Sequence, residues 1–189
     1  APTATIVVPT ATICTGQTIV FTSTTTNAPT AFSWTINPTT GVNFISGTTQ
    51  SLVSVSFSLA GIYTVSLTVS NLSGTVTTST NVLVNANPTS VFSASFTSVG
   101  FPNQIDLTNF STNATSYIWG YSDTPTTNTT TNASHSYTAS GAYTVTLVAT
   151  NVSGCVDISS YSFYLSDSSG ITCPNIFTPN ADGINDIFK

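Results

Sequence analysis

The chain has 189 residues, of which 40% are hydrophobic and 4% are charged, whereas about 25% charged residues is usual. One Lys, no Arg and a formal net charge of −5 exclude nucleic acid as a partner class, because phosphate binding needs clustered cations. No apolar run approaches the ~20 residues of a membrane helix, so membrane insertion is not expected either.

Thr and Ser are abundant, so solubility must come from hydroxyl and amide groups instead of charge. Thr is β-branched and suits the exposed face of a strand. We therefore expect an all-β protein with a neutral, hydroxyl-rich surface. No secretory leader pattern follows Ala1, and we expect a mature form or an excised fragment, for which export remains open.

An internal repeat organises the chain. In the first copy, "QTIVFTS" starts at Gln17, "FSW" spans 32–34 and "GIYTVSLTVSNLSG" spans 61–74. The last stretch alternates apolar and hydroxyl residues with a period of two, which predicts a strand with one buried face. A closing strand is predicted at 75–85. Short strands with frequent turn signals indicate a β-sandwich.

The second copy follows the short linker "NANPTS" at 85–90, where Pro88 limits bending. It contains "QIDLTNFS" from Gln104, "YIW" at 117–119, "GAYTVTLVATNVSG" at 141–154 and a closing strand at 155–165. The low-complexity run "TPTTNTTTN" at 124–132 is expected to be a surface loop. The chain therefore reads as two sandwiches in tandem.

Two aromatic positions recur in both copies. Trp34 and Trp119 could stack on sugar rings if exposed, but their strand spacing favours a place in each core. Tyr63 and Tyr143 each follow a Gly at the start of the penultimate strand, which is typical of a tyrosine corner, where the hydroxyl bonds to upstream backbone.

These residues carry a family resemblance over about 160 residues. The pattern G-x-Y-T-V-x-L-x-x-x-N-x-x-G after a Trp strand resembles the PKD repeat, which implies immunoglobulin-like sandwiches. "NASHSYTASG" at 132–141 is similar to that family's N-P-x-H-x-Y-x-x-x-G. The family's acidic W-D-F-G-D-G turn survives only as Asp123. PKD repeats commonly act as spacers, adhesion modules or accessory domains of secreted enzymes.

The closing stretch "CPNIFTPNADGINDIFK" at 173–189 resembles the start of the gliding-motility-associated C-terminal domain of Bacteroidetes, a sorting signal for type IX secretion. Asn180, Asp182 and Asp186 around Gly183 also offer oxygen ligands at alternate positions, which suits calcium. The alternative is a polar turn in which these side chains cap their own backbone. Calcium is the one cofactor that the sequence suggests.

The three cysteines invite a disulfide in an exported protein. The positions equivalent to Cys14 and Cys155 in the other copy hold no cysteine, so neither can pair within its own copy. We expect Cys14 and Cys155 to link the two domains. A Cys155–Cys173 bond and three free thiols are the alternatives.

Catalysis is not expected. His135 is the only His, and no nucleophile elbow, metalloprotease motif, nucleotide loop or pair of glycosidase carboxylates accompanies it. A Ser–His–Asp arrangement with Asp123 is arithmetically open, but a structural role for His135 in the PKD pattern is favoured.

The predicted organisation is a PKD-like β-sandwich at 1–86, a second at 87–166, and a tail at 167–189 that begins the sorting domain. The predicted function is a non-catalytic extracellular or cell-surface stalk for spacing or adhesion. Its partners would be copies of itself, surface glycans or proteins, and the type IX machinery. One alternative is a filament subunit that adds a strand from 1–8 or 176–188 to a neighbour. Another is the accessory region of a secreted polysaccharide-degrading enzyme.

Overall fold

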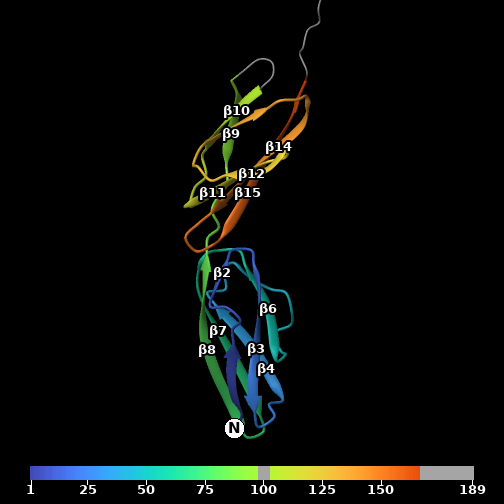
Figure 1. Cartoon of the computed structure of the whole chain (residues 1–189). Coiled ribbons are helices and arrows are strands. Elements are labelled where there is room, and N and C mark those ends of the chain that lie inside the picture. Colours follow the sequence, from blue (N-terminus) through green and yellow to red (C-terminus); the bar gives the residue numbers. More distant parts are fainter. Residues whose placement is uncertain (98–102, 167–189) are drawn as a thin grey trace, which may run out of the picture. The chain divides into compact units, whose positions relative to one another are not determined.

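The computed structural model describes residues 1–97 and 103–166, in which every regular element is a β-strand (Figure 1). The described chain contains no helix that is long and apolar enough to cross a membrane. The described residues form two compact units. The first comprises 1–91 with 111–117 and 148–158, and the second comprises 92–97, 103–110, 118–147 and 159–166.

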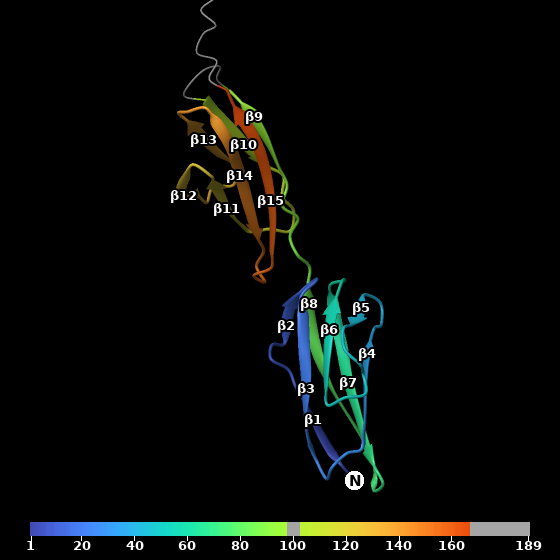
Figure 2. The same ribbon diagram turned by 90° about the vertical axis from the view of Figure 1, so that its right-hand side faces the viewer.

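The first repeat is a sandwich of two four-stranded sheets (Figure 2). One sheet has the order β1-β3-β6-β5, and the other has the order β2-β8-β7-β4. The strands are β1 (Thr3–Val7), β2 (Thr12–Cys14), β3 (Thr18–Thr26), β4 (Ala31–Asn37), β5 (Val42–Phe44), β6 (Leu52–Phe57), β7 (Gly61–Asn71) and β8 (Gly74–Asn85). Within these sheets β2 pairs with β8 in parallel, whereas the other registered pairs are antiparallel.

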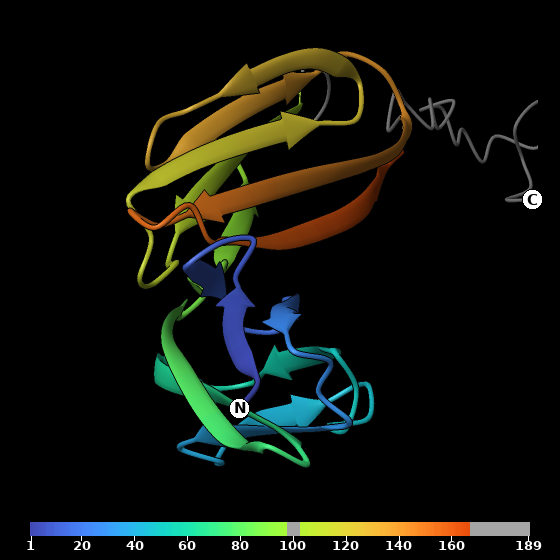
Figure 3. The same ribbon diagram turned by 90° about the horizontal axis from the view of Figure 1, so that it is seen from below.

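The second repeat has a three-stranded sheet, β13-β10-β9, and a four-stranded sheet, β12-β11-β14-β15. Its strands, from green to orange-red in Figure 3, are β9 (Phe92–Phe96), β10 (Asn103–Asn109), β11 (Ser116–Tyr121), β12 (Thr124–Asn128), β13 (Ala133–Tyr137), β14 (Gly141–Thr150) and β15 (Val156–Leu165). The tandem sandwich architecture predicted from the repeat is thus confirmed.

The indoles lie in the cores, as the strand spacing predicted. Trp34 is 2% exposed and Trp119 is fully buried. Each indole satisfies its N–H by donating to a backbone carbonyl, that of Gln50 at 2.8 Å and that of Thr130 at 3.0 Å. A stacking role on sugars is therefore closed to both side chains.

The tyrosine corners also form. The hydroxyl of Tyr63 donates to the carbonyls of Leu59 (3.0 Å) and Thr40 (3.2 Å), and the hydroxyl of Tyr143 donates to the carbonyl of Ala139 (2.9 Å). The bonds to Leu59 and Ala139 each reach four residues upstream, so the corner fixes how the chain enters β7 and β14.

Two expectations need correction. Residues 124–132 are not wholly loop, because Thr124–Asn128 forms β12 and pairs with β11. The β-branched Thr residues suit a strand, and without β12 the neighbouring β11 would be the edge strand of its sheet. Residues 1–8 are not a free donor strand, since β1 pairs with β3 from Thr3↔Thr26 to Val7↔Thr22.

Candidate functional site

Cys14 and Cys155 are joined by a disulfide, with their Cα atoms 5.7 Å apart. Both residues belong to the first compact unit, which includes the end of the second repeat that carries Cys155. Cys155 is 1% exposed and Cys14 is half-buried. Cys173 lies outside the described residues.

Backbone bonds support this covalent link from both sides. The N–H of Thr15 donates to the carbonyl of Asn85 at 2.9 Å, and the Asn87 side chain donates to the Thr15 carbonyl at 3.2 Å. The N–H of Cys155 donates to Oδ1 of Asn151 at 3.0 Å. The disulfide is therefore set in a hydrogen-bonded frame within the first unit.

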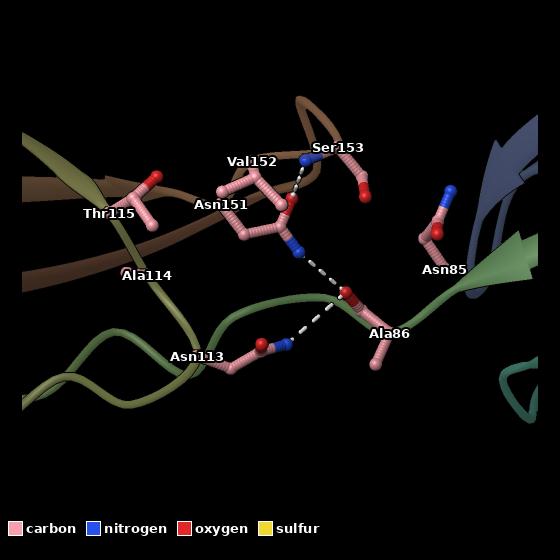
Figure 4. A pocket seen from close by; sticks show the side chains of 8 residues that line it. All are labelled: Asn85, Ala86, Asn113, Ala114, Thr115, Asn151, Val152 and Ser153. Carbon is pink, nitrogen blue, oxygen red and sulfur yellow. Dashed lines mark hydrogen bonds between the residues drawn. The ribbon is translucent and has the colours of Figure 1, made fainter.

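A shallow pocket of about 280 Å³ lies beside this frame (Figure 4). Its lining is neutral and comprises Asn85, Ala86, Asn113, Ala114, Thr115, Asn151, Val152 and Ser153. The amide of Asn151 donates to the Ala86 carbonyl at 2.8 Å, and Asn113 donates to the same carbonyl at 3.5 Å and to that of Asn87 at 3.2 Å. These two amides are thus occupied by the chain that enters the second repeat.

The first repeat contains a related asparagine pair, in which the second asparagine bonds to the first instead of to the incoming chain. Asn27 donates to the carbonyl of Ala1 at 2.9 Å, and Asn71 donates to the carbonyl of Asn27 at 2.6 Å. Asn27 and Asn113 both adopt positive φ, 58° and 55°, a conformation that Asn tolerates better than most residues. The recurrence indicates that the asparagine pair is a structural device of the repeat, and that the pocket is a by-product of it.

A second cluster of polar groups lies in the second unit, around the only His. Nε2 of His135 lies 2.9 Å from both carboxylate oxygens of Asp123. The imidazole stacks on Tyr121 with ring centroids 4.0 Å apart and meets Tyr137 edge-on at 4.6 Å. The Asp123–His135 pairing that sequence arithmetic left open therefore exists.

The two tyrosines of this cluster have hydroxyls that are buried and have no hydrogen-bond partner among the described residues. Burial, with a smaller contribution from the Asp123 charge, raises the pKa of the Tyr121 hydroxyl above its usual value. The same causes, again led by burial, raise the pKa of Tyr137 further. Both phenols remain neutral at physiological pH.

The corresponding core positions of the first repeat are apolar. Ile36, Val55 and Phe57 occupy the places of Tyr121, His135 and Tyr137, and all three are buried. Register supports the match, because Val55 pairs with Ile19 as His135 pairs with Ile105. A sandwich of this type thus packs with or without the polar cluster, which favours a structural role for His135.

Among the described residues, the Asp123–His135 pair is not extended to a Ser–His–Asp arrangement. The His135 ring has no hydrogen bond from a Ser or Thr hydroxyl there, so a nucleophile is not in place. The described chain also contains no group of three His, Cys, Asp or Glu side chains that could hold a metal. Asn180, Asp182 and Asp186 lie outside the described residues, and calcium binding by them stays a prediction.

The surface chemistry follows the composition. On β4, β7 and β8, the residues that face away from the core form rows across the sheet, such as Ser33–Thr68–Thr77. The hydroxyls of Thr68 and Thr77 bond across strands at 2.8 Å, as do those of Thr3 and Thr26 at 2.6 Å. Exposed Thr thus contributes cross-strand hydrogen bonds in place of ion pairs.

Sequence reasoning missed the asparagine pair and one carboxylate contact. Oδ2 of Asp157 accepts the backbone N–H of Ser90 at 2.8 Å. The repeat did contain a signal for the asparagines. Asn27 and Asn113 are 86 positions apart, which is also the separation of the buried residues Pro2 and Pro88 in the two copies. Asp157 has no counterpart in the first repeat, so the repeat gave no such signal.

Comparison with known proteins finds one matching family model and several similar solved structures. The model of the PKD domain matches residues 1–86 and 84–164. The PKD1 domain of the Vibrio cholerae metalloprotease PrtV is 26% identical, covers 42% of this chain and 98% of its own, and has a TM-score of 0.37. The PKD1 domain of Vibrio anguillarum Epp is 23% identical, covers 44% of this chain and 98% of its own, and has a TM-score of 0.36. The fibronectin(III)-like modules of Clostridium thermocellum CbhA are 15% identical over 87% of this chain and 95% of theirs, with a TM-score of 0.43.

No curated protein matches the chain. The family model, by contrast, covers nearly the whole described chain and places one match on each repeat. PKD domains are typically extracellular structural or accessory modules without catalytic activity. The chain belongs to the PKD domain family and contains two PKD domains in tandem.

Proposed function

We propose that the chain is a non-catalytic structural segment of a secreted or cell-surface protein, which holds other parts of that protein at a distance from the cell. The observation that carries this proposal is the pair of PKD domains in which the Cys14–Cys155 disulfide ties the end of β2 to the residue before β15. Disulfides of this kind persist in oxidising, extracellular compartments. Such a disulfide suits a structural segment, because it stabilises the folded state without any bound ligand.

Two further features support an extracellular role. A single Lys and no Arg leave trypsin-like proteases almost no cleavage site. The neutral hydroxyl surface also limits nonspecific attraction to charged partners. Adhesion through this surface to glycans or proteins remains part of the proposal, although the occupied amides of the asparagine pair give it no particular site.

Export by type IX secretion is the finer part of the proposal, and it rests on the motif at 173–189. The test is to express the full reading frame in the organism that encodes it, with intact cells labelled by an antibody against the PKD domains. We expect surface labelling that is lost when 173–189 is deleted and retained in the control Ser153→Ala. Labelling that appears only after lysis would refute the surface role, and labelling that survives the deletion would refute the sorting role of the motif.

Strand addition by 1–8 is not proposed, because β1 is already paired within its own sheet. A parent protein with a catalytic domain elsewhere would make the segment an accessory region, and the full reading frame distinguishes that case from a stalk.

A further inference from the structure

The position of the disulfide along the chain determines how the molecule carries load. Cys14 and Cys155 are 141 positions apart, so 140 residues lie between them. When a chain is pulled from its two ends, tension follows the shortest covalent path. That path runs from Ala1 to Cys14, crosses the disulfide, and continues from Cys155 toward Lys189.

We propose that the Cys14–Cys155 disulfide is a covalent by-pass that keeps tension out of the strands between the two cysteines, which form most of both PKD cores. Strands β3 to β14 all lie inside the loop that the bond closes. Both buried indoles, Trp34 and Trp119, are therefore within the by-passed segment. While the bond is intact, load reaches the cores only through the segments outside the loop, which contribute Ile13 and Leu165 to them.

The strands left outside the by-pass are few. β1 and the start of β2 precede Cys14, and β15 follows Cys155. β1 is held to β3 by five registered residue pairs and by hydroxyl bonds such as Thr3–Thr26, while β15 lies beside β14. Load can detach these edge strands, but it cannot unravel the strands between the cysteines.

The surroundings of the bond suit this task. Exchange with a thiolate requires access to a sulfur atom. Cys155 is 1% exposed, whereas Cys14 is half-buried, so access is restricted to the Cys14 side of the bond. The backbone on both sides is also fixed: the N–H of Cys14 donates to Oε1 of Gln17 at 2.9 Å, and that of Cys155 donates to Asn151 at 3.0 Å. A by-pass held in this way remains closed while its neighbours are loaded.

The length at stake is large. At roughly 3.4 Å per extended residue, the 140 by-passed residues hold roughly 480 Å of chain. In a molecule with the disulfide, the chain between the cysteines does not extend under load. In a molecule without the disulfide, that chain can unfold and extend. The inference rests on the proposed structural role only for the origin of tension in the organism, since a pulling experiment supplies the load itself.

The test is single-molecule stretching of the full chain between handles at Ala1 and Lys189. The wild type is compared with Cys14→Ser, with Cys155→Ser and with the matched control Cys173→Ser. A non-reducing mass map of each preparation records which thiols are bonded.

We expect wild type and Cys173→Ser to release only the short lengths outside the loop. Cys14→Ser and Cys155→Ser should each release roughly 480 Å more, in two steps that correspond to the two sandwiches. Full release by wild-type molecules that the mass map shows to be bonded would overturn the by-pass. Extra release by Cys173→Ser but not by Cys14→Ser would overturn it too, because the load would then cross a Cys155–Cys173 bond.

Discussion

Replacing Tyr137 by Phe should make the protein more stable. The Tyr137 side chain is fully buried, and its hydroxyl has no partner among the described residues. Burying an unpaired hydroxyl costs about 1–3 kcal/mol in proteins. The ring contacts would remain, with centroids at 4.3 Å from Tyr143 and 5.4 Å from Phe163. Phe57 already fills the equivalent place in the first repeat, so the shape is compatible with the fold.

Allowing for the small void left by the oxygen, we expect Tyr137→Phe to raise the free energy of unfolding by about 1 kcal/mol. Urea titrations followed by Trp fluorescence would measure it. The matched control is Tyr143→Phe, which loses the bond to the Ala139 carbonyl and should be destabilised by about 0.5–1.5 kcal/mol. A loss of stability in Tyr137→Phe larger than in the control would refute the reasoning, since it would show that the hydroxyl is paired.

The same substitution has a pH signature. The folded-state pKa of Tyr137 is raised from an unfolded value of 10.0, mainly by burial. The proton is therefore held more tightly in the folded state, and this contribution to stability is complete below pH 10.0 and is lost as pH rises above it. Wild type should thus lose stability more steeply than Tyr137→Phe in alkaline solution. Equal slopes in unfolding titrations above that pH would contradict the burial of the hydroxyl.

Three more substitutions test other parts of the structure. Trp34→Ala should cost about 3–5 kcal/mol, because it empties a fully packed core; a shift in urea midpoint worth less than half of this would place the indole outside the core. Cys14→Ser should cost about 5 kcal/mol, the value expected for a loop of this length, whereas an unchanged midpoint would mean that the bond does not form in solution. Asn151→Ala should cost about 2 kcal/mol because it removes three hydrogen bonds. Ser153→Ala, a substitution in the same turn, should change the urea midpoint little. If Ser153→Ala and Asn151→Ala shifted the midpoint equally, the asparagine pair would have no structural role.

Most of the sheet structure could be predicted from the sequence because the same strand patterns recur in both repeats. Period-two alternation around Tyr63 and Tyr143 identified β7 and β14, and the recurring Trp identified β4 and β11. A repeat reveals little where its copies diverge. Thr124–Asn128 became a strand because pairing with β11 outweighs its low complexity, and that pairing is a tertiary effect that no local pattern records.

The candidate site was less visible in the sequence. Spacing alone suggested the pairing of Asp123 with His135. The stacking of Tyr121 on the imidazole and the edge-on contact of Tyr137 depend instead on where β11 and β13 lie in opposite sheets. The asparagine pair also depends on contacts between segments far apart in sequence, such as Asn151 with Ala86. Such contacts follow from the fold, and they become predictable only once the fold is known.

Native-state hydrogen exchange, resolved strand by strand, tests most directly whether each PKD repeat has its own core. We predict that the slowest amides fall in both central strands, at 65–69 in β7 and at 145–149 in β14, where the inward-facing side chains are completely buried. Slow exchange confined to one repeat, with the other exchanging as freely as an unfolded chain, would contradict the account.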